Sequence, residues 1–392
     1  MRAVIGHLSG RGDQHRRGRI VQCRPPGAPP HGGKDMSNRS RRRTTALALA
    51  LGASLTLAAC GSGSDSGSSG GGGGKGDFTV GISNAQGAQP ILKLTQDSFT
   101  AAAKRDGIKV KALDAQLDPA KQVTDVDQLV AQRVDLIVVY PLDANSLKPA
   151  LKRAEAAGIK VVGWAGMASP DADPGVLTSN VDTGGSYRGS KLLGDYVKDK
   201  VGGQSKVLGV GLGVPVPALE TMMSQYDKTV TDGTDISWIG RVDNPTDDIA
   251  GAQKVVATAL TKYQNDVQAI MAYNDSSAIG AAVAAKAAGL KDVVIVGQNG
   301  DEDGVKAVED GRLSATVDLV PWRTGLILAT VSKAILDGKK VPAYIESPTE
   351  LFTKENLGDR VPWDEAKSKI ASGAMTCADG GGCPDDVASL VK

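Results

Sequence analysis

Amide, carboxylate and indole side chains follow several short apolar stretches of the sequence. They are Asn84 with Gln86 and Gln89, Trp164, Asn274 with Asp275, and Gln298 with Asn299. Amides both donate and accept hydrogen bonds, and an indole ring presents a flat apolar face. These groups suit a small uncharged molecule that carries hydroxyl groups on one side and C–H surface on another. We therefore predict that Asn84, Gln89, Trp164, Asn274 and Asn299 contact such a ligand.

Each of these residues also has an ordinary structural interpretation. Asn274 and Asp275 precede a helical stretch, and both residue types cap helix N-termini. We expect Asp275 to be the cap and Asn274 to contact the ligand. Trp164 could be a core aromatic residue, and Asn299 could serve the turn at Gly300.

The elements that must position these side chains are short apolar strands that alternate with amphipathic helices. Helices are expected to end at Gly107, Gly158, Gly289 and Gly311, because glycine adopts the left-handed cap without strain. The predicted strands span residues 77–83, 108–115, 135–141, 159–165, 205–213, 235–242, 267–274, 292–300 and 313–320.

This alternation is typical of parallel sheets that are covered by helices on both faces. The span from Asp77 to Lys392 is longer than one such core usually supports, so we expect two α/β lobes. The strand count alone would also allow a closed (β/α)₈ barrel.

Residues 271–325 resemble the second half of sugar-binding periplasmic proteins of the ribose-binding type, which have the type 1 fold. The resemblance rests on the pair Asn274-Asp275, the turn VGQNG at 296–300, the segment GRLSAT at 311–316, and Pro321. Residues 113–162 resemble the first domain of the same family, and the whole resemblance covers 78–341. It implies two Rossmann-like lobes joined by a three-segment hinge, with the ligand between them.

The resemblance also implies where the chain crosses between the lobes. We expect crossings near 179–182, 318–321 and 340–344. The first lobe would contain 77–180 and 319–341, and the second would contain 181–318 with 342–392, tail included. Asp182 and Asp318 lie at the first two crossings and join the predicted ligand contacts.

The sequence departs from the family's sugar-binding pattern in four places. No aromatic pair follows the first strand, and Gly163-Trp164-Ala165 stands where an Asp-Arg pair is common. The helix near 217–227 carries Glu220 and Thr221 where an arginine is expected, and Asn299 replaces an aspartate. These departures put a simple pentose or hexose in doubt and favour a less hydroxylated polyol, a nucleoside-like ring or a small signalling carbohydrate.

The region before the predicted body has the layout of an export signal. Arginines at 39 and 41–43 precede an apolar run at 44–58, which is too short to span a bilayer as a mature helix. Leu57-Ala58-Ala59-Cys60 resembles the lipobox of bacterial lipoproteins, which implies lipidation of Cys60. We interpret 36–59 as a lipoprotein signal peptide, 60–76 as the lipidated cysteine with a Gly/Ser tether, and 1–35 as an upstream start-codon assignment or a disordered extension.

Removing that leader changes the charge and the available chemistry. Residues 1–59 hold 11 of the 45 Lys and Arg and 2 of the 44 Asp and Glu, which leaves 34 basic and 42 acidic residues and a formal charge of −8. An acidic body argues against a nucleic-acid partner. All three histidines also lie before residue 60, which excludes histidine-dependent catalysis and histidine-bearing metal sites; no metal or cofactor is expected.

Two cysteines remain in the body, Cys377 and Cys383, in the sequence CADGGGC. The oxidising environment of an exported protein favours a disulfide between them.

The resemblance implies a non-enzymatic, lipid-anchored extracytoplasmic protein that captures a small carbohydrate-like solute for an ABC permease. A sensor of the same fold that reports to a membrane signalling protein is the first alternative. A carboxylate-dependent glycosidase is a second. A repressor with the same lobes would need a basic helix-turn-helix before Phe78, where the sequence has a glycine tether.

Overall fold

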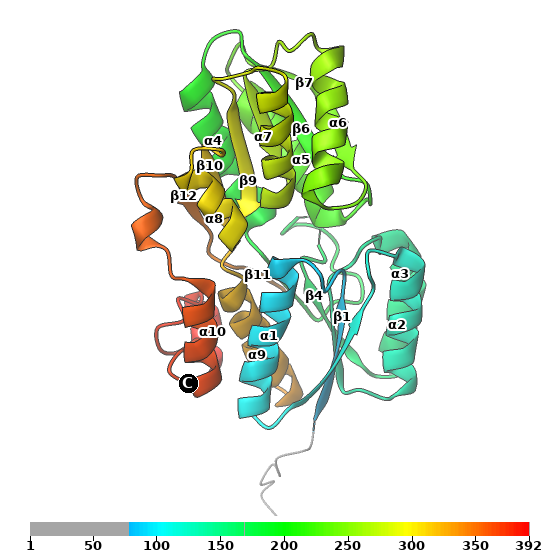
Figure 1. Cartoon of the computed structure of the whole chain (residues 1–392). Helices are drawn as coiled ribbons and strands as arrows, with labels where there is room; N and C mark the ends of the chain where they lie inside the picture. Colours follow the sequence, from blue (N-terminus) through cyan, green and yellow to red (C-terminus); the bar gives the residue numbers. More distant parts are fainter. Residues whose placement is uncertain (1–77, 168, 392) are drawn as a thin grey trace, which may run out of the picture. The chain divides into compact units, whose positions relative to one another are not determined.

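The structure is a computed structural model, and it describes residues 78–167 and 169–391 (Figure 1). The predictions for the leader at 1–59, for lipidation of Cys60 and for the tether at 61–76 lie outside these residues. Within the described ranges, no helix combines the length and hydropathy required to cross a bilayer.

The first lobe is built on a sheet in which all six strands are parallel. Helices pack on it in pairs, α1 (Pro90–Arg105) with α9 (Pro321–Leu336) and α2 (Pro119–Ala131) with α3 (Ala144–Ala156). In spatial order the strands are β11 (Tyr344–Glu346), β5 (Ser179–Asp182), β4 (Lys160–Trp164), β3 (Leu136–Val139), β1 (Thr79–Asn84) and β2 (Lys109–Asp114).

The second lobe has a sheet of the same size, parallel except for one antiparallel edge strand, β12 (Glu350–Phe352). In spatial order the strands are β12, β10 (Ala315–Asp318), β9 (Val294–Asn299), β8 (Ala269–Ala272), β6 (Lys206–Leu212) and β7 (Ser237–Asn244). The helices are α4 (Ser190–Val201), α5 (Pro217–Thr231), α6 (Ile249–Lys262), α7 (Asp275–Ala287) and α8 (Glu302–Glu309), and a π-helical turn (Gly185–Gly189) precedes α4. The predicted fold class is confirmed, and the single closed barrel is excluded.

Helix boundaries follow the local signals in the sequence. The Asp118 side chain caps α2 by accepting hydrogen bonds from the backbone N–H groups of Ala120 and Lys121, and Pro119 occupies the first helical position. The four glycines predicted to end helices all have positive φ, between 74° and 77°, as their cap role requires (Gly107, Gly158, Gly289 and Gly311).

The chain passes between the lobes where the first two crossings were predicted, after β5 and between β10 and α9. The third crossing lies at 347–349 rather than 340–344, because Tyr344 still pairs with Asn180 in the first sheet. The predicted boundary of the first lobe at 341 is therefore too early.

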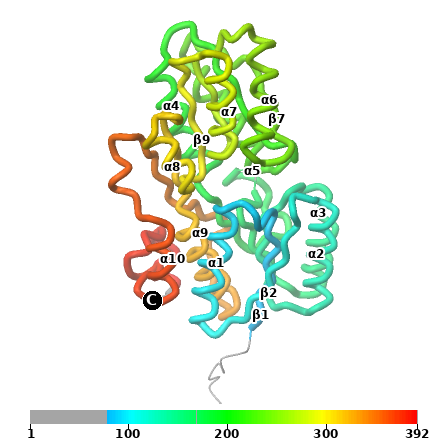
Figure 2. The backbone as a smooth tube through the Cα atoms, in the orientation of Figure 1, coloured from blue at the N-terminus to red at the C-terminus, as the bar shows by residue number. Residues whose placement is uncertain are grey.

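The C-terminal tail differs from its predicted assignment to the second lobe. After β12 the chain returns to the first lobe, where α10 (Trp363–Ser372) packs on α1 (Figure 2). Helix α11 (Asp385–Ala388) packs on α9. The physical reason is apolar burial, since Trp363, Ile370 and Val387 are all buried in the core that includes α1 and α9. The predicted disulfide between Cys377 and Cys383 lies in this tail, with Cα atoms 5.1 Å apart.

The returning tail reinforces the second crossing through Asp318. One carboxylate oxygen of Asp318 accepts hydrogen bonds from Arg360 Nε at 3.0 Å and Trp363 Nε1 at 3.3 Å. The other accepts from the backbone N–H of Val320 at 2.7 Å, where a β-branched residue adopts the left-handed conformation (φ 47°). The tail thus holds a strained backbone position at the hinge.

Three buried carboxyl groups link stability to pH: Asp182 and Asp318 at the first two crossings, and Asp301 at the start of α8. Burial raises the pKa of Asp182, Asp301 and Asp318 to about 6 in each case, from an ordinary value of 3.8. Between these two values the folded protein retains protons that the unfolded chain has lost. The contribution of these groups to the free energy of unfolding is therefore fully present below pH 3.8 and is lost as the pH rises through 6.

We predict that Asp182→Asn stabilises the protein at pH 7 by about 1–3 kcal/mol and has little effect at pH 3.5. The amide oxygen still accepts from the Gly184 N–H, and the Tyr344 hydroxyl, whose interaction with the carboxylate lowers the pKa of Asp182, can accept a hydrogen bond from the new amide nitrogen. Urea unfolding at both pH values measures the effect. Asp235→Asn, at an exposed position, is the matched control and should change neither value. Parallel pH profiles for Asp182→Asn and the wild type would contradict this account of Asp182.

Candidate functional site

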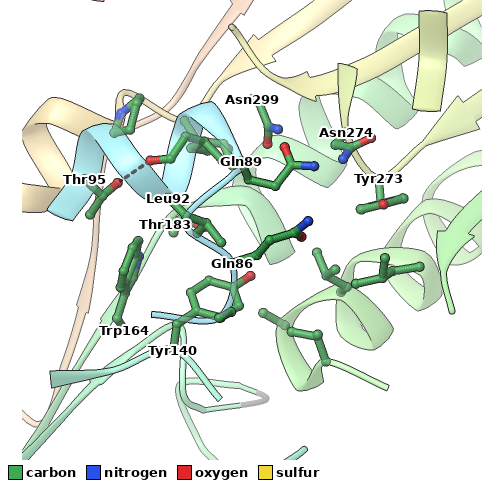
Figure 3. A pocket seen from close by; sticks show the side chains of 18 of the residues that line it. Gln86, Gln89, Leu92, Thr95, Tyr140, Trp164, Thr183, Tyr273, Asn274 and Asn299 are labelled. Atoms are coloured by element: carbon green, nitrogen blue, oxygen red, sulfur yellow. Dashed lines mark hydrogen bonds between the residues drawn. The ribbon is translucent and has the colours of Figure 1, made fainter. Parts of the chain in front are cut away.

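A cavity lies at the carboxyl ends of strands from both sheets (Figure 3). This is the expected position of a ligand in open α/β sheets, because connecting loops diverge there. The first lobe contributes Gln86, Gln89, Tyr140 and Trp164, and the second contributes Asp247, Tyr273, Asn274 and Asn299.

The carboxylate of Asp247 organises the polar part of the cavity. It accepts hydrogen bonds from the Tyr273 hydroxyl, from Asn274 Nδ2 at 2.8 Å and from Gln89 Nε2 at 2.6 Å. Gln89 Nε2 also contacts the backbone carbonyl of Asp247 at 2.9 Å. Because Gln89 belongs to the first lobe, this cluster joins the two lobes directly. Burial raises the pKa of Asp247, although the three donors oppose the shift.

Asn274 has two structural roles besides its place in the cavity lining. Its Oδ1 accepts from the backbone N–H of Ser277 at 2.8 Å, so Asn274, and not Asp275 as expected, caps α7. Asp275 instead accepts from Thr316 Oγ1 at 2.7 Å and from the backbone N–H of Gly300 at 2.8 Å. Asp275 therefore fixes the turn after β9.

That turn presents Asn299 to the cavity. Asn299 has φ of 125°, which is unusual for a residue with a side chain. Gly300 follows with φ of 69°, and a Cβ atom there would come within 2.5 Å of Asp318 Cα. Only glycine therefore allows the close approach of β9 and β10 that positions Asn299.

Tyr140 and Trp164 form the aromatic side of the cavity. Their rings meet edge to face, with centroids 5.3 Å apart and an interplanar angle of 88°. Trp164 is 1% exposed, so it mainly orients Tyr140 and offers little ring surface to a ligand. Burial raises the pKa of the Tyr140 hydroxyl, which keeps it protonated and able to donate.

The structure brings four of the seven predicted contacts to the cavity, namely Gln89, Trp164, Asn274 and Asn299. It corrects the prediction for Asn84, Asp182 and Asp318, which do not line it. Asn84 bonds to Gln96 and to its own loop, Asp182 accepts from the backbone of Gly184, and Asp318 is held by the tail. Gln298 is also buried elsewhere, where it donates to the Tyr226 hydroxyl at 2.7 Å.

The polar lining residues that were missed from the sequence include Tyr140, Asp247 and Tyr273. Tyr140 follows β3, Asp247 lies in the loop after β7, and Tyr273 follows β8. The rule that selected Asn84 and Asn274 would have found them if it had been applied to every strand end. Within residues 78–167 and 169–391, no cluster of His, Cys, Asp or Glu could hold a metal ion.

Fold and cavity together define a two-lobed solute-binding protein. The family model described as "Periplasmic binding protein domain" matches residues 80–340, and the chain belongs to this family. The matches to ribose import binding proteins place it among the type 1 periplasmic sugar-binding proteins.

Curated relatives and solved structures agree with this assignment. The ribose import binding protein of Bacillus subtilis is 29% identical over 72% of this chain and 89% of its own length. The one of Salmonella typhimurium is 30% identical over 68% and 87%. The arabinose-binding component of an ABC transporter from Shewanella sp. ANA-3, solved with bound L-arabinofuranose, has a TM-score of 0.65 and 26% identity over 75% of this chain and 97% of its own.

The bond between Gln89 and Asp247 predicts how the unliganded lobes behave. A hydrogen bond to a charged group contributes about 1.5–3 kcal/mol, so its loss should shift the population toward separated lobes. We expect Gln89→Ala to increase the radius of gyration of the ligand-free protein in small-angle X-ray scattering. Gln86→Ala changes the same loop without removing a bond between the lobes and should leave the scattering unchanged. Equal curves for both variants and the wild type would show that the bond does not hold the lobes together.

Proposed function

We propose that this protein is a lipid-anchored, extracytoplasmic solute receptor that captures a small uncharged sugar or polyol and delivers it to an ABC importer. The observation that carries the proposal is the cavity, where amide, phenol and hydroxyl groups from both lobes converge. A bound solute would bridge Gln86 and Tyr140 on one lobe and Asn299 on the other.

Release of an unchanged ligand fits the chemistry of the lining better than catalysis. Glycoside hydrolysis commonly uses two carboxyl groups that flank the scissile bond. Among the described lining residues, Asp247 is the single carboxylate, and its oxygens already accept three side-chain hydrogen bonds. The relatives named as import binding proteins support transport over sensing.

Ligand binding can be tested with isothermal titration and thermal shift against ribose, arabinose, xylitol and inositol. A ligand at a hundredfold excess over its Kd should stabilise the folded protein by about 2.7 kcal/mol. Tyr140→Phe should weaken binding about tenfold, since it removes a donor from the cavity, and should leave the stability of the free protein unchanged. Tyr196→Phe is the control, because its hydroxyl bonds to Ser314 away from the cavity. Binding that is identical in both variants would place the ligand elsewhere.

Lipid anchoring is tested separately by membrane fractionation of the expressed full chain. The expected result is that the wild type sediments with membranes and Cys60→Ser does not, because the thiol that would carry the lipid is gone. Cys23→Ser, which changes the other cysteine before the body, should remain with the membranes. Membrane association that survives Cys60→Ser would contradict lipidation at this residue.

A further inference from the structure

One wall of the cavity is formed by apolar side chains from the second lobe. We call it the α5 wall, and it consists of Leu212 at the end of β6, Val216 before α5, and Leu219 and Met222 within α5. Pro217 starts α5 and Val216 precedes it, so the first turn of the helix directs aliphatic groups to the cavity. A ligand that fills the space must place part of its surface against this wall.

Several hydroxyl groups in the lining are already used within the protein. Thr95 Oγ1 donates to the Ile91 carbonyl at 2.9 Å, and Ser186 Oγ donates to the Ala218 carbonyl at 3.1 Å. Thr324 Oγ1 donates to Ser347 Oγ at 3.2 Å. Because each of these hydroxyl protons is used within the protein, the three groups cannot donate hydrogen bonds to a ligand without breaking an existing one.

Four other polar lining residues keep unused hydrogen-bonding groups and lie in one part of the lining. Among the described residues, the Gln86 and Asn299 amides and the Tyr140 hydroxyl form no side-chain hydrogen bond, and Gln89 Oε1 has no partner although it is buried. Figure 3 shows Gln86, Gln89 and Asn299 near one another, with the Tyr140 hydroxyl directed toward Gln86. We call Gln86, Gln89, Tyr140 and Asn299 the polar edge.

Charge adds a second restriction. None of the described lining residues is Lys or Arg. An anionic ligand would have no cation to pair with, and a cationic ligand would meet an Asp247 carboxylate that already accepts from Tyr273, Asn274 and Gln89. The cavity therefore favours an uncharged molecule.

We propose that the ligand is an amphipathic carbohydrate: an uncharged sugar or polyol that carries a deoxygenated or alkylated face. This inference rests on the proposed solute-binding function and specifies its substrate class. The hydroxyl groups of the ligand bond to the polar edge, and its apolar face packs on the α5 wall. A fully hydroxylated sugar of the same size would bury hydroxyl groups against Leu219 and Met222, where they find no partner.

The test uses matched pairs of ligands in isothermal titration with the full chain. The pairs are galactose with fucose (6-deoxygalactose), mannose with rhamnose (6-deoxymannose), each in both enantiomers, and ribose with its methyl furanoside. We expect at least one deoxy or alkylated member to bind tenfold or more tightly than its parent. Parents that bind equally or more tightly in every pair would overturn the amphipathic inference and leave the proposed sugar-binding function intact. Absence of binding to every member would count against both the inference and the proposed function.

Two variants connect the preference to the α5 wall. Leu219→Gln places an amide on the wall and should reduce the preference for the derivative at least tenfold, mainly by weakening its binding. Leu192→Gln makes the same change in a partly buried residue of α4 that does not line the cavity, and it should preserve the preference. Thermal unfolding of both ligand-free variants shows that each is folded. A preference unchanged in folded Leu219→Gln would place the apolar part of the ligand away from this wall.

Discussion

The buried carboxylate of Asp247 is the group on which the geometry of the cavity depends. It lies 8% exposed in a loop where its own φ is 54°, and it accepts from two side chains of its own lobe and one of the other. A buried carboxylate without hydrogen-bond partners would destabilise the folded state, so the three donors must stay within hydrogen-bond distance of it. Asn274 is held from both sides, because its other amide atom caps α7. The Asp247 carboxylate and the N-terminus of α7 therefore determine how Asn274 is oriented, and the same carboxylate orients the Tyr273 hydroxyl.

A second constraint acts at the hinge, where the tail and Asp318 meet. Arg360 donates to the Asp318 carboxylate at 3.0 Å and to the Gly300 carbonyl at 2.7 Å. Gly300 adjoins Asn299 in the cavity lining, so the Arg360 guanidinium links the returning tail with the cavity end of β9. The tail, whose apolar residues are buried on α1 and α9, thus extends the first lobe toward the turn that presents Asn299.

The repeated strands and helices were predictable because each carries its own local signal. Periodic apolar residues, prolines at helix starts and glycines at helix ends act within a few residues of the chain. The assignment of the tail was not predictable in this way, because Trp363 and Val387 are buried by α1 and α9, which lie far away in sequence. Asp318 shows the same limit. Its place beyond a strand end suggested a ligand contact, and only the folded chain brings Arg360 and Trp363 to its carboxylate.

The cavity was predictable in position and incompletely in composition. The strand-end rule selects Gln89, Asn274 and Asn299, which line the cavity, because the rule follows from topology. The rule does not reveal which amides already form hydrogen bonds within the protein. Those bonds join residues far apart in the sequence, such as Gln89 and Asp247, which are separated by 158 residues. The same limit applies to the α5 wall, since Leu219 and Met222 have the spacing of ordinary core residues on an amphipathic helix. An apolar helix face that alone would only stabilise a lobe here also borders the cavity. The position of the cavity follows from the fold, whereas the balance of engaged and free polar groups in its lining depends on contacts between residues that are distant in the sequence.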